Sequence, residues 1–242
     1  AMMHDGKALQ GGTSHNFGDG FARAFNVQYL DRDNTLKYCY QTSWGISTRM
    51  IGAIIMAHGD DSGLVLPPAV APIQVAVIPI AQHKEGVLEK AAEITEQLSK
   101  IVRVKCDDSE QSPGWKFSEY EMKGVPLRVE IGPKDIENNQ CVIVRRDTRE
   151  KIFVPLDQLT KTIPELLSAF TKALYDKALE RRQSMSSTAT KLDELIQTAK
   201  TRPGFIRAMW CGDEACELKL KEVADVTSRC MPFDEAPCAD TC

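Results

Sequence analysis

Arg49 is the residue around which the chemistry of this chain can be organised. It follows a polar stretch, Thr42-Ser-Trp-Gly-Ile-Ser-Thr48, and precedes an apolar run that continues to Gly59. The run is apolar on every side, which predicts a buried helix that begins near Thr48, is capped by the Thr48 hydroxyl and ends at Gly59. A guanidinium in the first turn of a buried helix needs an anionic partner. A neighbouring carboxylate and a bound phosphate both satisfy that need.

A second polar segment, Gln10-Gly-Gly-Thr-Ser-His15, carries further side chains that could bind a ligand. Its two adjacent glycines allow the backbone to approach something closely, and Gln10, Thr13 and His15 lie beside them. The segment matches neither the P-loop nor the dinucleotide-binding pattern. By its spacing alone it is therefore weak evidence for a phosphate site.

Cysteines cluster near the end of the sequence. Five of the eight fall in the last 32 residues, and Cys211 and Cys216 are separated by four residues. The first residues, Ala1-Met-Met-His-Asp5, lack the pattern of a signal peptide, so this density favours metal binding over disulfides, with unliganded core thiols as the alternative. A second pair of ligands must come from Cys230, Cys238 and Cys242. Four thiolates would form a closed, structural zinc site without an open catalytic position.

Length and composition are those of a globular protein of one large or two modest domains. The 242 residues include 26% charged and 43% apolar residues, and no run is apolar enough to span a membrane. The net charge is −4. Residues 205–242 contain eight acidic and four basic residues, which excludes a basic nucleic-acid arm there. We expect a cytoplasmic protein.

Strand and helix patterns must position these residues, and the middle of the chain predicts a compact α/β domain. The expected strands and helices alternate, which indicates βαβ units and a mixed, mainly parallel sheet. The proline-rich stretch 63–72 marks a domain boundary. The expected strands are 75–79, 101–105, 127–131 and 141–145; the expected helices are 86–100, with Val87, Leu88, Ala91, Ile94 and Leu98 inward, 112–122 and a long one from Pro164.

The last quarter of the chain predicts a separate small module. Periodic leucines continue the long helix to Arg182, and residues 191–200 form another helix. The polar stretch 184–190 between them is expected to be a hinge. Residues 204–210 have strand character and lead directly into Cys211. The predicted domains are thus residues 1–68, 69–180 and 181–242.

Charged residues accompany the predicted sheet near its Gly132-Pro133 turn. Arg128 and Glu130 alternate with apolar neighbours, and Arg145 and Arg146 end another strand. A solvated face is the plain interpretation of any one of them. Together they could form a polar surface for a nucleic acid, without a pronounced basic patch. The residues considered for that surface are Lys116, Glu119, Lys123, Arg145 and Arg146.

Two of these segments together resemble one family. Trp44-Gly-Ile-Ser-Thr-Arg49 is similar to motif 3 of class II aminoacyl-tRNA synthetases, in the form used by prolyl-tRNA synthetases of the eukaryotic and archaeal type. Gln10-Gly-Gly-Thr-Ser-His15 is similar to another segment of that family. The resemblance continues in order through segments 58–60, 63–68, 112–117, 123–126, 130–133 and 145–147 and ends at Cys211-Gly-x-x-x-Cys216.

The resemblance implies ATP-dependent activation of L-proline and its transfer to tRNA(Pro). Arg49 and His15 would be the catalytic residues. Gln10, Thr13, Ser47 and Arg49 would bind ATP, with Gln10 acting through Mg²⁺, and His15, Trp44 and Gly45 would bind proline. Adenylate formation is an in-line displacement that requires alignment and neutralisation of charge, which Arg49 and Mg²⁺ supply.

The family fold implied is α/β within an α+β whole. Residues 1–68 would be the end of the antiparallel-sheet catalytic domain, followed by an anticodon-binding domain with a mixed sheet and a small zinc-binding α+β module. Lys116, Glu119, Glu130 and Arg145 are the candidates near the anticodon surface. Single-stranded bases can be read on such a polar sheet face.

Two departures from the family pattern matter. Motif 1, which forms the dimer interface, and motif 2, which supplies another ATP-binding arginine, are not in this sequence, so we expect a fragment of a homodimeric enzyme. Cys242 has the position of a third zinc ligand after Cys211 and Cys216. The fourth ligand would be Cys238 or a cysteine outside the sequence.

Two other functions are compatible with the sequence. A non-catalytic tRNA-binding module would retain residues 1–68 only as a remnant. The absence of motif 2 favours that module, whereas the intact Gln10, Thr13, His15 and Arg49 favour the enzyme. A zinc-stabilised scaffold without an RNA role would explain the cysteines but not Arg49.

Overall fold

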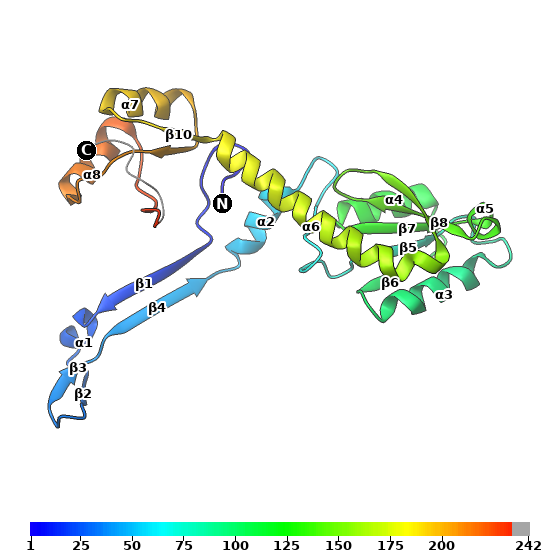
Figure 1. Cartoon of the computed structure of the whole chain (residues 1–242), viewed down its shortest axis with the longest axis horizontal. Coiled ribbons are helices and arrows are strands. Elements are labelled where there is room, and N and C mark those ends of the chain that lie inside the picture. The colour runs from blue at the N-terminus through cyan, green and yellow to red at the C-terminus, as the bar shows by residue number, and fades with distance from the viewer. Residues whose placement is uncertain (234–242) are drawn as a thin grey trace.

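The computed structural model describes residues 1–233 and arranges them as three regions along the chain (Figure 1). An extended two-stranded ribbon comes first, a five-stranded sheet with its helices comes second, and a small module comes last. The 26-residue helix α6 (Leu159–Ser184) runs from the sheet to the last module. Among the described residues, no helix combines the length and apolarity needed to span a bilayer.

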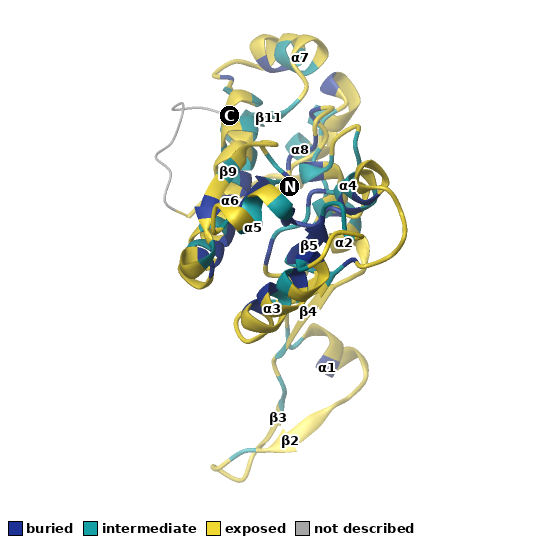
Figure 2. Ribbon diagram, turned by 90° about the vertical axis from the view of Figure 1, so that its right-hand side faces the viewer, coloured by how far each residue is buried: buried dark blue, intermediate teal, exposed yellow. Residues whose placement is uncertain are grey.

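The first region is a ribbon made of β1 (Gly12–Gly18) and β4 (Gln41–Ile46), which pair antiparallel. Between them lie α1 (Gly20–Ala24) and the hairpin of β2 (Gln28–Leu30) and β3 (Leu36–Tyr38). Both strands of the ribbon are almost entirely exposed. The β2–β3 hairpin at its end is mostly exposed as well (Figure 2). The two strands of the ribbon are therefore held together mainly by their backbone hydrogen bonds.

The helix predicted after Thr48 is present as α2 (Arg49–His58), with Thr48 at its N-cap and Gly59 at its C-cap. Its predicted burial is wrong, because only Ala53 and Ala57 are buried and Ile51 is 61% exposed. The predicted cap is also wrong. The Thr48 side chain makes no capping hydrogen bond, and the Arg49 backbone N–H donates instead to Ser47 Oγ at 3.3 Å.

The second region contains a mixed sheet in the order β6–β5–β7–β8–β9. The strand β5 pairs in parallel with β6 and β7, whereas β8 pairs antiparallel with β7 and β9. The sheet is mixed as predicted but is not mainly parallel, because the β8–β9 hairpin adds two antiparallel pairings. The strands are β5 (Val75–Pro79), β6 (Val104–Cys106), β7 (Leu127–Ile131), β8 (Gln140–Arg145) and β9 (Lys151–Pro155).

Successive strand residues point to opposite faces of the sheet, and helices cover both of these faces. Val75 and Val77 pack with residues of α3 (Val87–Ser99) and α6, whereas Ala76 and Ile78 pack with Tyr120 of α4 (Pro113–Met122). The short α5 (Pro133–Glu137) follows β7. The two faces make this region the main hydrophobic core of the chain.

Several predicted boundaries in this domain change. The predicted inward residues of α3 are buried, except that Leu88 is 40% exposed. The long helix starts at Leu159, after a short 3₁₀ turn (η1, Leu156–Gln158), rather than at Pro164. Its earlier start is explained by packing, since Leu159 and Ile163 are buried in the core beneath the sheet. The strand predicted at 101–105 is shifted to Val104–Cys106.

The last region contains α7 (Leu192–Thr201), α8 (Glu214–Ala224) and the parallel pair β10 (Ser186–Thr188) and β11 (Phe205–Arg207). The hinge predicted at 184–190 is wrong, because β10 lies within it and pairs with β11. A small core joins these elements through Ala189, Leu195 and Ala224. The predicted strand 204–210 is shortened to three residues.

Candidate functional site

The ribbon brings together the two polar segments that sequence patterns single out. In the antiparallel register Thr13 lies opposite Gly45, and His15 lies opposite Ser43. Because β4 leads into α2, the residues before β1 lie beside the start of that helix. The segments 10–15 and 44–49 therefore form one continuous surface, although at least 28 residues separate them in the sequence.

The glycine pair at the start of β1 is explained by this close packing. A Cβ atom on Gly12 would lie 3.1 Å from the carbonyl oxygen of Gly45, and one on Gly11 would lie 3.1 Å from the sulfur of Met50. Both distances are tighter than ordinary Cβ contacts. The two glycines are therefore needed for the close packing of this segment against β4 and α2 of the same chain, and not for the approach of a ligand.

The pleat decides which side chains share a face of the ribbon. Residues directly opposite one another in an antiparallel pair point to the same face, and alternate residues share it. Thr13, His15, Ser43 and Gly45 therefore lie on one face, and His15 stacks on Phe17 with ring centroids 5.2 Å apart. Trp44 lies opposite Ser14 and belongs to the other face. The structure does not bring the Trp44 side chain together with His15.

Arg49 occupies the first turn of α2 beside Ser47, at the end of the ribbon that also carries Gln10. It is exposed, so the expectation of a buried guanidinium is wrong. Within residues 1–233 no ion pair involves Arg49, which leaves the carboxylate alternative without support there. The guanidinium at a helix N-terminus is consequently open to an anion from solvent.

The candidates in the sheet domain are held differently. Lys116 is only 1% exposed, and its Nζ donates to the Asp107 carbonyl oxygen at 2.7 Å and to Gln82 Oε1 at 3.1 Å. Burial alone would raise the pKa of the Asp107 carboxyl, but hydrogen bonds from Ser109 and the charge of Lys116 hold it below its ordinary value. The expectation that Lys116 lies on the surface is therefore wrong, because it anchors the loop after β6.

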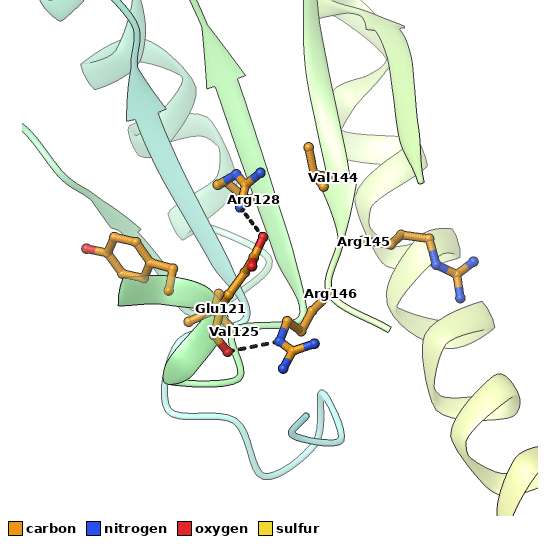
Figure 3. Close-up of a pocket in the computed structure, with 7 residues that line it drawn as sticks. Glu121, Val125, Arg128, Val144, Arg145 and Arg146 are labelled. Carbon is orange, nitrogen blue, oxygen red and sulfur yellow. Dashed lines mark hydrogen bonds and ion pairs between the residues drawn. The ribbon is translucent and has the colours of Figure 1, made fainter. Parts of the chain in front are cut away.

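The other three candidates are also paired. Glu130 is 8% exposed and binds Arg128 at 2.9 Å, and Glu119 is half-buried and pairs with Lys123. Arg145 forms a two-point ion pair with Asp147, with N–O distances of 2.8 and 3.1 Å. The Asp147 hydrogen bond raises the pKa of the Arg145 guanidinium. Figure 3 shows the Arg145 side chain on the α6 side of the sheet, away from Arg128.

Sequence patterns did not single out Phe117 and Glu121 beside these charges. The guanidinium of Arg128 lies 4.0 Å from the centre of the Phe117 ring. It also pairs with Glu121 at 3.2 Å (Figure 3). The cavity between Glu121, Arg128 and Arg146 has a volume of only about 10 Å³, which is about the room of one water. A ligand would have to bind the outer surface of this network. The only sequence signal for this network of charges was that Arg128 and Glu130 alternate with apolar neighbours.

The two described zinc candidates both belong to the last region. Cys211 is in the loop after β11, and Cys216 is in the first turn of α8, whose N-cap Asp213 accepts a hydrogen bond from the Ala215 N–H. A helix start favours a thiolate, which suits a metal ligand. Cys238 and Cys242 lie outside the described residues. Among residues 1–233, no three His, Cys, Asp or Glu side chains come together as a metal-binding group.

Comparison with known families and proteins identifies two segments of the chain. Residues 74–166 match the family described as "Anticodon binding domain", and residues 192–242 match "Prolyl-tRNA synthetase, C-terminal". The first match covers the β5–β9 sheet with its helices. The second begins at α7 and includes Cys211 and Cys216.

Whole proteins are similar over the entire chain. The chain is 62% identical to the proline–tRNA ligase of Clostridium novyi and 60% identical to that of Ruminiclostridium cellulolyticum, in both cases over 242 residues. Proline–tRNA ligase 2 of Bacillus cereus is 58% identical over the same length. Each alignment covers 100% of this chain and 51% of the relative. The chain thus spans about half the length of the curated relatives that it matches.

These matches confirm part of the resemblance. A segment that matches an anticodon-binding domain is followed by one that matches the C-terminal domain of prolyl-tRNA synthetases, in the order that the resemblance implies. The three relatives named above are bacterial proteins, so the assignment to a eukaryotic and archaeal type is not confirmed.

Proposed function

From these matches we infer that the chain is the C-terminal part of a prolyl-tRNA synthetase, and we propose that the complete protein is a proline–tRNA ligase. It activates L-proline with ATP to prolyl-adenylate and transfers the prolyl group to tRNA(Pro) for protein synthesis in the cytoplasm. The support is about 60% identity along the whole chain to proteins with that name. The observation that carries the catalytic part is the pairing of segment 10–15 with segment 44–49.

The roles proposed on the ribbon follow from its geometry. Arg49 and Ser47 at the N-terminus of α2 hold the phosphates of ATP, because the guanidinium and the helix dipole both attract anions there. Thr13 and Gln10 complete the nucleotide contacts. Mg²⁺, when bound, neutralises phosphate charge, and the exposed amide oxygen of Gln10 is a ligand of the hard type that this cation prefers.

Proline binding is proposed for the face that carries His15. The Gly45 backbone lies opposite Thr13 without a side chain, which leaves room beside His15 for a small ring. Trp44 remains a candidate for proline binding, although its side chain belongs to the face of the ribbon that does not carry His15. In the adenylation step a proline carboxylate oxygen bonds to the α-phosphorus while the bond to pyrophosphate breaks. Arg49 stabilises the charge that develops during this displacement.

Binding of tRNA(Pro) is proposed for the β5–β9 domain, supported by its match to an anticodon-binding family. Glu119, Glu130 and Arg145 are the candidate base contacts, and Lys116 contributes by fixing the loop that contains Asp107. Phe117 and Arg128 form a stacked aromatic and cationic pair beside Glu130, on the sheet face opposite to Arg145. Such a pair suits an unstacked base.

The remaining features are proposed from the family pattern. Zinc is held by Cys211, Cys216, Cys242 and Cys238 or another thiol, and about one zinc per complete protein is expected by elemental analysis. A metal-free protein that folds normally would contradict this site. The complete protein is of the eukaryotic and archaeal type, a proposal supported by the motif Trp44–Arg49. It is a homodimer, which the family pattern implies through motif 1, a segment that this sequence does not contain. Its domains within this chain are residues 1–68, 69–180 and 181–242.

The test of the proposed function is proline-dependent exchange of pyrophosphate into ATP by the complete protein. We expect exchange with L-proline and transfer of the amino acid to tRNA(Pro). A complete protein that binds tRNA(Pro) but shows no proline-dependent exchange would instead be a non-catalytic RNA-binding module.

A further inference from the structure

The C-terminal end of α2 is held by a side chain from a distant part of the chain. Arg181, near the end of α6, donates from Nη1 to the carbonyl oxygen of Ala57 at 2.8 Å. The last carbonyls of a helix lack partners within the helix, and a cation there is favoured by the helix dipole. The end of α2 is thereby tied to the helix that leads into the last region.

Asp60, two residues after α2, is tied to the sheet domain. Its two carboxylate oxygens accept from Nη1 and Nη2 of Arg146 at 2.8 and 2.6 Å, across 86 residues of sequence. The Arg146 side chain is only 2% exposed, and its Nε donates to the carbonyl oxygen of Glu121 at 2.9 Å (Figure 3). The Arg146 hydrogen bonds lower the pKa of the Asp60 carboxyl to about 2. The pair is therefore fully charged at neutral pH.

Backbone contacts continue this attachment along the segment after Asp60. The N–H groups of Leu64 and Leu66 donate to the carbonyl oxygens of Met122 and Gly124, at 3.0 and 3.3 Å. A Cβ atom on Gly63 would lie 2.6 Å from the Met122 backbone, and its φ of +126° also requires glycine. Val65 is buried with Phe170 of α6. Residues 60–66 therefore form a fixed joint rather than a loose linker.

The joint lies at one end of α2, and the candidate nucleotide residues lie at the other. Ten helical residues span about 15 Å, so a tilt of about 10° at the joint would move the first turn of α2 by about 2.6 Å. Because the ribbon and α2 would move together, such a tilt would change the distance between their nucleotide site and a tRNA held on the sheet domain. A displacement of about 1 Å between reacting groups can reduce a rate about 100-fold. The direction of α2 relative to the sheet domain thus depends on how firmly this joint is held.

We propose that Asp60 is a positioning residue: through Arg146 it fixes the direction of α2 relative to the anticodon-binding domain, and so aligns the adenylate site with a bound tRNA. The inference rests on the proposed function. The inference predicts different effects on the two partial reactions, adenylate formation and transfer of the prolyl group to tRNA. Adenylate formation needs only the ribbon and α2 together with the catalytic part of the enzyme. Transfer to tRNA also needs the correct placement of the domain that holds the RNA.

The experiment compares Asp60→Asn with Asp61→Asn in the complete protein. Asp61 is the adjacent acidic residue, is exposed and forms no ion pair within the described part of the chain. We expect Asp60→Asn to lower kcat/KM for tRNA prolylation about 10-fold or more, with pyrophosphate exchange within about twofold of wild type. Asp61→Asn should leave both reactions unchanged. Asp60→Glu, which keeps the carboxylate, should restore part of the lost prolylation.

Hydrogen–deuterium exchange of the backbone amides provides a readout that does not depend on activity. Asp60→Asn should accelerate exchange in residues 60–66, and Asp61→Asn should not. Unchanged protection there, unchanged prolylation, or an equal loss in both partial reactions would overturn the inference. A wild-type protein without proline-dependent exchange would refute the proposed function instead, so the two failures are distinguishable.

Discussion

The ribbon and the sheet domain are both built from strands, but they bury their side chains very differently. Val75, Val77 and Val129 of the sheet are fully buried, whereas Trp44 and Ile46 of the ribbon are 79% and 67% exposed. Figure 2 shows the same contrast, with buried residues around β5 and exposed residues along β2, β3 and α1. Helices cover both faces of the sheet, and no other described strand extends the β1–β4 pair.

This difference decides what a polar side chain does in each region. In the sheet domain Lys116, Glu130 and Arg145 have protein partners, as buried or partly buried charges must. In the ribbon, Thr13, His15 and Ser47 are exposed and Arg49 has no ion pair in the described part of the chain. The ribbon therefore presents side chains to a ligand, whereas these three charged residues of the sheet domain stabilise its own structure.

The largest expected effect is on the free energy of unfolding, which should respond differently to substitutions in the two regions. Ile143→Ala removes a side chain that is 0% exposed in the sheet core, and we expect it to lower the free energy of unfolding by about 2–5 kcal/mol. Ile46→Ala, in the exposed ribbon, should change it by less than about 0.5 kcal/mol. Denaturant midpoints measured by circular dichroism compare the two. Equal losses would mean that the ribbon is as closely packed as the sheet.

The next test is catalytic. Arg49→Ala in the complete protein should lower proline-dependent pyrophosphate exchange about 100- to 1,000-fold, because charge on the reacting phosphate loses its partner. Since Arg49 is exposed, the unfolding midpoint should not change. Arg32→Ala, an exposed arginine at the far end of the ribbon, is the matched control and should retain exchange. Normal exchange by the Arg49 variant would remove its assigned role.

A smaller effect separates structural from RNA-binding charges in the sheet domain. Lys116→Met leaves the Asp107 carbonyl oxygen without its 2.7 Å donor, so we expect a loss of about 1–3 kcal/mol in the free energy of unfolding. Lys105→Met, at an exposed position, should have little effect. Chemical denaturation and tRNA binding should be measured together. Weaker tRNA binding at unchanged stability would return Lys116 to the RNA surface.

The smallest expected effect is a pH dependence at the end of α2. Burial, followed by the charges of Arg181, Lys177 and His4, lowers the pKa of His58 below 6.5. The unfolded chain then binds this proton more readily, so stability is lost as the pH falls below about 6.5, with a slope under about 1.4 kcal/mol per pH unit. His58→Gln should reduce the loss between pH 7.5 and 5.5. His83→Gln, at an exposed position, should lose stability as wild type does.

Local patterns predicted the elements of the sheet domain well. The α3 residues Val87, Ala91, Ile94 and Leu98 repeat at helical spacing and are all buried. Ser112 and Pro113 predicted the start of α4, where the Ser112 hydroxyl accepts from the Trp115 N–H. The burial of α2 was predicted wrongly because an apolar run does not indicate which of its faces will be covered.

The sequence by itself determined the two polar segments, their family resemblance and the bounds of α2, because motifs, caps and periodicity are local properties of the chain. Only the tertiary structure decided that segments 10–15 and 44–49 pair, that Lys116 is buried, and that Asp60 meets Arg146 across 86 residues. A charged side chain has the same local signature whether it faces solvent, a ligand or a partner. Its partner depends on which distant segments the fold places beside it.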